Sequence, residues 1–263
     1  MSISKEYVAD QLTVKICRNR QEVGETAADA VAAKIMALLE TQEVVNVIFA
    51  AAASQNEFLA ALLTRTVDWS RVNAFHMDEY LGLPVGAPQH FGAFLKERLF
   101  ARAPFREVFY LNGNPSLPEE ECRRYAGLLQ AYPTDITCMG IGENTHLAFN
   151  DPHMADFHDP YLVKVVDLDV PCRQQQVNEG CFATLEEVPV DAFTLTIPAL
   201  LKAQAIYCMV PGKSKAAAVY HTLTEPVSET YPSTILRTLP QAVLFLDHDS
   251  AERIADIREG VFR

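Results

Sequence analysis

The sequence predicts an α/β fold, a doubly wound and mostly parallel sheet with helices on both faces. Two observations favour this class. Short apolar runs, typical of strands buried on both faces, alternate with longer segments of helical periodicity. No repeat, low-complexity segment or linker interrupts the alternation. With 263 residues, 49% of them hydrophobic and 21% charged, the chain is expected to form one domain over residues 1–263.

The expected elements follow from apolar spacing. Helical segments carry apolar residues at intervals of three and four, as Val23, Ala27 and Val31 do, whereas strands are short apolar runs bounded by polar or turn residues. The expected strands are residues 12–17, 44–50, 72–77, 107–111, 135–142, 161–168, 192–197, 205–210 and 241–247. The expected helices are residues 20–40, 55–66, 90–100, 117–132 and 213–223. The proline and acidic residues that open segment 117–132 are typical of a helix N-terminus.

Composition narrows the classes of partner and compartment. A net charge of −12 argues against nucleic acid or an anionic membrane as the main partner, although a local lysine can still bind a phosphate. The six cysteines form no CxxC pair, so no zinc or redox motif is supported and no metal or cofactor is expected. The first residues lack the apolar core of a signal peptide, and no apolar run is long enough to span a membrane, which indicates a cytoplasmic protein.

The segment MDEYLGL, residues 77–83, places two adjacent carboxylates directly after an expected strand. In an α/β protein, a carboxylate at the C-terminal end of a strand points into the usual ligand crevice. Asp78 and Glu79 are therefore candidates for a functional site. The alternative is that they are turn residues that hydrogen-bond the loop.

A second polar segment, MGIGENTHLAFNDP, covers residues 139–152. Gly140 and Gly142 end an expected strand, where they allow a tight turn and a close approach to a ligand. His146 follows, with Asp151 five residues further along, and this pair suits a general base and its orienting partner. A loop histidine without a role is the alternative reading.

The two segments together resemble the motifs of the glucosamine-6-phosphate deaminase family, which shares a Rossmann-like fold with 6-phosphogluconolactonases and ribose-5-phosphate isomerase. The resemblance implies an amino sugar phosphate substrate, converted to fructose 6-phosphate and ammonia. It implies that Asp78 is the base that removes the C2 proton, that His146 carries the proton of ring opening and that Asp151 is its partner. The family more often has glutamate at position 151 and glycine at Thr145. Asn144 is expected to orient its neighbours.

For the phosphate, the resemblance points first to Lys215, which follows a strand and a glycine. The family usually has a glycine-containing PTGGTP-like loop where this chain has AAAASQN, residues 50–56, and only Ser54 keeps a hydroxyl. Ser54 and the backbone N–H groups after it are candidates for phosphate binding. A plain helix N-cap is an equally open role for Ser54.

Further candidates complete the expected substrate site. An arginine of some family members would fall near Gly180, so Arg173 or Arg237 is expected to replace it. Gly142, where the backbone can come close to a ligand, and Glu79 are placed with the substrate-binding residues, and Glu79 is also expected to shape its loop.

Two other functions fit part of the pattern. A 6-phosphogluconolactonase would also need a phosphosugar site and a histidine, but no carbon base. A sugar-phosphate-binding regulator without turnover is the third hypothesis, because two glycines are missing from residues 50–56. The sequence does not distinguish gluco from galacto substrates. It also leaves the oligomeric state open, so a homo-oligomer is one alternative.

Overall fold

The computed structural model describes residues 3–254, so the expected domain of residues 1–263 extends past the described part at both ends. Its main sheet has eight strands in the order β1-β2-β11-β10-β7-β3-β4-β6, and every neighbouring pair except β1 with β2 is parallel. The strands are β1 (Ile3–Ala9), β2 (Leu12–Cys17), β3 (Val45–Phe49), β4 (Val72–His76), β6 (Glu107–Phe109), β7 (Ile136–Met139), β10 (Ala205–Val210) and β11 (Ala242–Asp247). The predicted doubly wound, mostly parallel sheet is confirmed.

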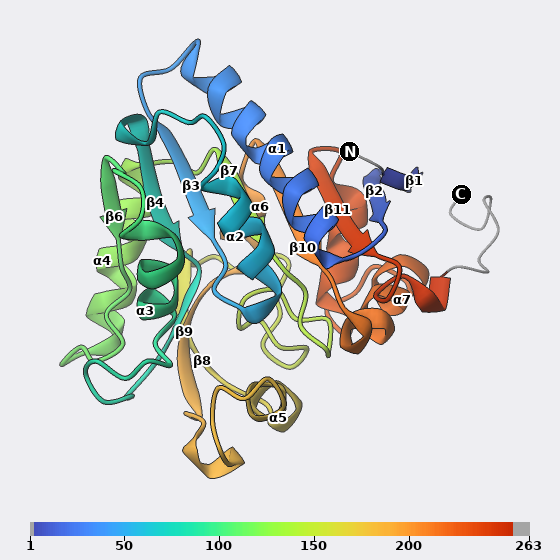
Figure 1. The fold of residues 1–263 in the computed structure, drawn as a ribbon. Helices are drawn as coiled ribbons and strands as arrows, with labels where there is room; N and C mark the ends of the chain where they lie inside the picture. Colours follow the sequence, from blue (N-terminus) through green and yellow to red (C-terminus); the bar gives the residue numbers. More distant parts are fainter. Residues whose placement is uncertain (1–2, 255–263) are drawn as a thin grey trace.

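Helices cover both faces of this sheet, as predicted (Figure 1). One face packs against α1 (Arg20–Leu39), α2 (Asn56–Leu62), α3 (Phe91–Leu95) and the π-helical turn Lys96–Phe100. The other face packs against α4 (Pro118–Ala131), α6 (Ile197–Leu201) and α7 (Ala216–Thr224). Short 3₁₀ turns cover Ala53–Gln55, Trp69–Arg71, Leu185–Glu187, Lys213–Lys215, Pro232–Thr238 and Glu252–Ile254. Among residues 3–254, no helix is both long and apolar enough to cross a membrane.

A second, three-stranded antiparallel sheet lies beyond the carboxyl ends of the main strands and is not distinguished by the sequence (Figure 1). Its strands are β5 (Asp78–Tyr80), β9 (Asp191–Leu195) and β8 (Val163–Asp167). Segments 161–168 and 192–197 contain strands, as expected, but these strands belong to the second sheet and not to the main one. Helix α5 (Val170–Asn178) was not predicted, although Asp169 caps it and Pro171 lies in its first turn, which is a typical helix start. Strand β1 was also not predicted.

The topology places a ligand crevice at β3 and β7. These two strands are neighbours, but the chain continues from β3 outward to β4 and β6, and from β7 in the opposite direction to β10. At such a switch point the connections leave the two strands in opposite directions, which opens a crevice outside their carboxyl ends.

Candidate active site

A pocket of about 490 Å³, including space open to solvent, lies at this crevice. Its wall is formed by the segments that follow β3, β4, β7 and β10, together with α5 and Phe91. The lining side chains that carry polar or charged groups are Ser54, Asp78, His146, Gln175, Gln176 and Lys215. Five of the predicted site residues are therefore brought together from distant parts of the chain: Ser54, Asp78, Gly142, His146 and Lys215.

Asp78 enters the pocket where the chain crosses from one sheet to the other. β4 ends at His76, and Asp78 begins β5, where it is paired in register with Thr194 of β9. The Asp78 side chain is buried, and its Oδ1 has no hydrogen-bond partner among the described residues. Burial, with a smaller contribution from the charge of Glu79, raises the pKa of Asp78 well above its ordinary value. A carboxylate with a raised pKa is a stronger base once it is ionised.

The backbone of Asp78 is fixed by a buried histidine that the sequence analysis did not single out. The ring of His76 accepts a hydrogen bond at Nε2 from Leu111 N–H (2.8 Å), so Nδ1 carries the proton and donates to Asp78 O (2.9 Å). Burial lowers the pKa of His76, which keeps the ring neutral. The hydroxyl of Tyr125 bonds both the N–H and the C=O of His76.

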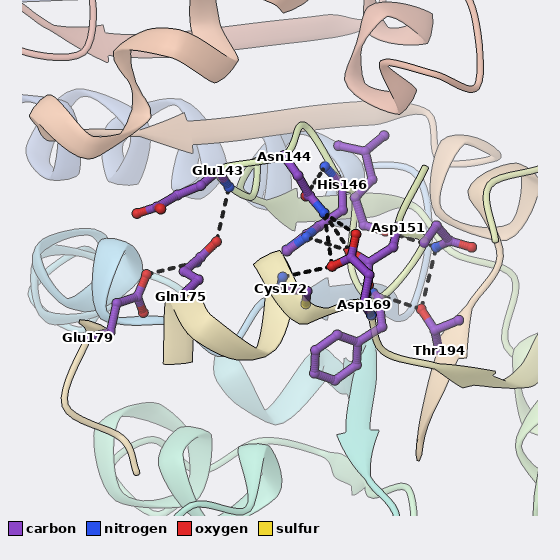
Figure 2. Close-up of polar contacts among 12 residues, drawn as sticks. Glu143, Asn144, His146, Asp151, Asp169, Cys172, Gln175, Glu179 and Thr194 are labelled. Carbon is purple, nitrogen blue, oxygen red and sulfur yellow. Dashed lines mark hydrogen bonds and ion pairs between the residues drawn. The ribbon is translucent and has the colours of Figure 1, made fainter. Parts of the chain in front are cut away.

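His146 and Asp151 form a second chemical group in the same segment. Nδ1 of His146 lies 3.0 Å from Oδ1 of Asp151, which leaves Nε2 as the nitrogen that can exchange a proton at the pocket (Figure 2). Burial alone would raise the pKa of Asp151, but His146 and hydrogen bonds from Asn144 and the Asp169 N–H hold its pKa below the ordinary value. Asp151 is therefore an ionised partner for the imidazole.

Asn144 and the start of α5 organise this pair. The Asn144 amide donates to Asp151 (2.9 Å) and to Asp169 (3.2 Å), and its oxygen accepts the His146 N–H (3.2 Å) (Figure 2). Asp169 in turn caps α5 by accepting the Cys172 N–H. Asn144 thus has the contacts of an orienting residue, whereas Asp169 was missed because α5 was not predicted.

Two local features hold the segment that carries His146 and Asp151 in place. Thr194, opposite Asp78 in register, accepts the N–H of Phe149 (3.0 Å), so one residue ties the Asp78 strand to the His146 segment. Thr145 has a φ of 71°, a left-handed conformation that β-branched residues rarely adopt. The glycine that the family has at this position would adopt that conformation without strain.

The expected phosphate end is formed by Lys215 and Ser54. Lys215 lies in the turn between β10 and α7 and is 5% exposed, and its Nζ is 3.8 Å from Oε1 of Glu179. Ser54 lines the pocket inside a 3₁₀ turn. It caps no helix, because the residue at the N-cap of that turn is Ala52 and the one at the N-cap of α2 is Gln55. The N-cap alternative for Ser54 is therefore wrong.

Two expected binding residues, both arginines, have other roles. Arg173 donates to the carbonyl oxygens of Leu185 and Val188 and so ties α5 to the following turn. Arg237 donates to the carbonyl oxygens of Leu223 and Glu225. Neither guanidinium lines the pocket, so the expectation that one of them replaces the missing arginine is wrong for this structure.

The expected substrate-binding role of Glu79 is also wrong, because its side chain does not line the pocket. Its carboxylate accepts the N–H groups of Phe91 and Gly92 at the start of α3, and His90 lies 3.2 Å from it. Glu79 therefore shapes the structure beside Asp78, as one of its two expected roles required, and does not line the pocket. Gly142 does line it, and a Cβ there would lie 2.2 Å from the His146 ring.

The donor atoms of His146, Asp151 and Cys172 lie within 4.8 Å of one another, as do those of Asp151, His153 and Asp169. Histidine, cysteine and carboxylate side chains are metal ligands in other proteins. Here, however, the Asp151 carboxylate already accepts hydrogen bonds from Asn144 and Asp169, and burial raises the pKa of the Cys172 thiol well above its ordinary value. The group is suited to proton transfer, and we assign no metal to it.

Fold and site together define an α/β protein with a carboxylate, an imidazole–carboxylate pair and a buried lysine in one crevice. The family of glucosamine-6-phosphate isomerases/6-phosphogluconolactonase matches residues 18–244. The chain belongs to this family.

Individual relatives give the same assignment. The glucosamine-6-phosphate deaminases of Bacillus thuringiensis (strain Al Hakam) and Bacillus cereus (strain AH820) are each 34% identical to this chain over 242 residues, which is 90% of either sequence. The solved structure of a monomeric glucosamine-6-phosphate deaminase is 27% identical, with a TM-score of 0.82 over 91% of this chain and 98% of that one. The 6-phosphogluconolactonase of Thermotoga maritima, 21% identical with a TM-score of 0.72 over 89% and 98%, shares the fold.

Proposed function

We propose that this protein is an isomerising glucosamine-6-phosphate deaminase that converts an amino sugar 6-phosphate to fructose 6-phosphate and ammonia. The observation that carries the proposal is the convergence of Asp78, His146 and Lys215 on one pocket. A carbon base, a proton carrier and a cation are the three groups that this reaction needs. The relatives named deaminases, at 34% identity over most of the chain, support the same reaction.

Ring opening is assigned to His146. Its Nε2 takes the proton of the C1 hydroxyl and returns it to the ring oxygen as the C1–O5 bond breaks. The imidazolium formed in between is stabilised by the ionised Asp151, which lies 3.0 Å from Nδ1. Asn144 fixes the two residues relative to each other, because it donates to the Asp151 carboxylate and accepts the backbone N–H of His146.

Isomerisation is assigned to Asp78. Its carboxylate removes the proton from C2 of the open-chain aldehyde as O1 takes up a proton, which gives an enolamine. The same carboxylic acid then delivers its proton to C1 as the nitrogen loses one, so the proton gained by O1 balances the proton lost by the nitrogen. The product is an imine at C2, which water hydrolyses to the ketone and ammonia. The rigid backbone contact with His76 keeps the carboxylate fixed for both transfers.

Substrate, compartment and assembly complete the proposal. Lys215 binds the phosphate, with Ser54 as a hydroxyl donor beside it. The six cysteines are free, as in reduced cytoplasmic proteins, and we propose the cytoplasm as the site of action. A glucosamine-6-phosphate deaminase of known structure is monomeric, and we propose that one chain is likewise sufficient for activity here.

The proposal is tested by ammonia release from purified protein supplied with glucosamine 6-phosphate. Release by the wild type and its loss in Asp78→Asn are expected, and galactosamine 6-phosphate in parallel identifies the preferred stereoisomer. Hydrolysis of 6-phosphogluconolactone is measured on the same samples. Lactone hydrolysis without ammonia release would favour the lactonase, and phosphosugar binding with neither activity would favour the regulator.

A further inference from the structure

An ion pair between a buried lysine and a partly buried glutamate lies at the phosphate end of the pocket. Lys215 is nearly inaccessible to solvent, and Glu179, at the C-cap of α5, places Oε1 3.8 Å from its Nζ. Burial lowers the pKa of Lys215, whereas the charges of Glu179 and Glu143 oppose that effect. In this structure, Glu179 is therefore a counter-ion of the ammonium group.

The carboxylate of Glu179 is held in this position by Gln175, which also bonds the segment that carries His146. Nε2 of Gln175 donates to Glu179 Oε1 (2.8 Å), and Oε1 of Gln175 accepts the Glu143 N–H (3.0 Å) (Figure 2). Gln175 itself lines the pocket. One glutamine thus fixes the counter-ion of the lysine relative to residues 143–151.

A phosphate bound to Lys215 would meet this carboxylate. Two anions that share one ammonium group repel each other, and the repulsion is strong where water is excluded. A contact that stabilises the free protein and is lost in the complex weakens binding by the free energy of that contact. Binding of a phosphate then requires that Glu179 moves away from Lys215.

We infer that Glu179 is a placeholder counter-ion for Lys215, displaced by the phosphate of the substrate, and that it sets the affinity of the pocket for anions. The inference rests on the phosphate-binding role of Lys215 in the proposed function. It makes Glu179 a specificity-determining residue that takes no part in proton transfer.

The test variant is Glu179→Gln, which removes the charge but keeps an oxygen that can accept the bond from Gln175. We expect the dissociation constant for inorganic phosphate, measured by calorimetry, to fall by about fivefold. We expect the melting temperature of the ligand-free protein to fall by about 2 °C, because the ammonium group loses its counter-ion. If Glu179 had only a structural role, the substitution would weaken phosphate binding and lower the melting temperature together. Unchanged or weaker phosphate binding would overturn the inference.

Glu97→Gln is the matched control. Glu97 lines the neighbouring cavity, pairs with Arg98 and has a mostly exposed side chain, so its substitution removes one negative charge without touching Lys215. We expect neither the phosphate affinity nor the melting temperature to change. Equal strengthening of phosphate binding by both variants would mean that net charge is the cause, and would overturn the inference.

The calorimetric measurement needs no turnover, which separates the two proposals. Tighter phosphate binding by Glu179→Gln without ammonia release from the wild type would support the counter-ion and overturn the deaminase. Ammonia release by the wild type with unchanged phosphate affinity in the variant would support the deaminase and overturn the counter-ion role of Glu179. If both proposals hold, the variant lowers KM for the amino sugar phosphate and leaves kcat unchanged.

Discussion

Nδ1 of His146 lies 3.0 Å from Oδ1 of Asp151, and the Asp151 side chain is completely buried. An ionised carboxylate in this position orients the ring and stabilises its protonated form. Asp151→Asn keeps the shape of the side chain and removes the charge. We expect kcat for ammonia release to fall by about 10²-fold or more, with a small change in KM, as steady-state kinetics would show.

The chain provides an internal control for this variant. His153 and Asp167 form a similar pair at 2.9 Å, but both side chains are exposed and lie outside the pocket. Asp167→Asn is expected to leave kcat unchanged. If Asp151→Asn had no greater effect than Asp167→Asn, the buried pair would have no part in ring opening.

The pH dependence of activity is expected to reflect the buried state of Asp78. The base must be ionised to remove the C2 proton, and burial raises the pKa of Asp78 well above its ordinary value. We expect kcat/KM to fall with decreasing pH at a higher pH than for an exposed carboxylate. A pH–rate profile that stays flat down to the ordinary aspartate range, about 4, would contradict this assignment.

The same raised pKa has a consequence for stability. Because the folded protein holds the Asp78 proton more tightly than the unfolded chain does, the stabilising contribution is complete below the unfolded pKa and is lost as pH rises through the folded pKa. Asp78→Asn cannot ionise. At pH ~8 we expect the free energy of unfolding of the variant to exceed that of the wild type by about 1–3 kcal/mol, and its melting temperature to be higher. At pH ~4 we expect little difference between the two proteins. A lower melting temperature at both pH values would show that the carboxylate stabilises the fold.

The contact between His76 and Asp78 O predicts different effects for two amide variants. The amide of His76→Asn replaces ring Nδ1 and keeps a donor for Asp78 O, whereas that of His76→Gln replaces Nε2 and keeps an acceptor for Leu111 N–H. We expect kcat of the asparagine variant to stay within about tenfold of the wild type and that of the glutamine variant to fall about 10²-fold. Melting temperatures measured in parallel separate positioning from folding. Equal loss of kcat in both variants would contradict a specific role for Nδ1.

The sequence predicted the fold class, because strands buried on both faces and amphipathic helices have distinct apolar spacing. It also placed Asp78 and His146 next to strand ends, where parallel topology brings side chains together. It could not predict that Thr194 joins the two segments, since a threonine in an apolar run carries no signal for a hydrogen bond across 45 residues. Long-range pairing in the small antiparallel sheet decides that contact.

The charged residues of the phosphate end were the least predictable. Arg173 and Arg237 were expected to replace an arginine that falls near Gly180 in some family members, but both guanidinium groups bond carbonyl oxygens of turns that only the folded chain creates. Glu179 has no motif of its own, and its proximity to Lys215 depends on helix α5. Sequence spacing does not determine such contacts.

Gly142 provides the last prediction, because the His146 ring packs directly against it. A Cβ at Gly142 would lie 2.2 Å from ring atoms, so the ring must move in Gly142→Ala. We expect kcat to fall about 10²-fold, since a shift of about 1 Å is enough to misplace a proton carrier. Gly127→Ala is the control, because a Cβ at this exposed position of α4 meets nothing within 4 Å and is expected to stabilise the helix by about 0.5–1 kcal/mol. Full activity of Gly142→Ala, measured by ammonia release beside Gly127→Ala, would mean that the position of the His146 ring does not limit the reaction.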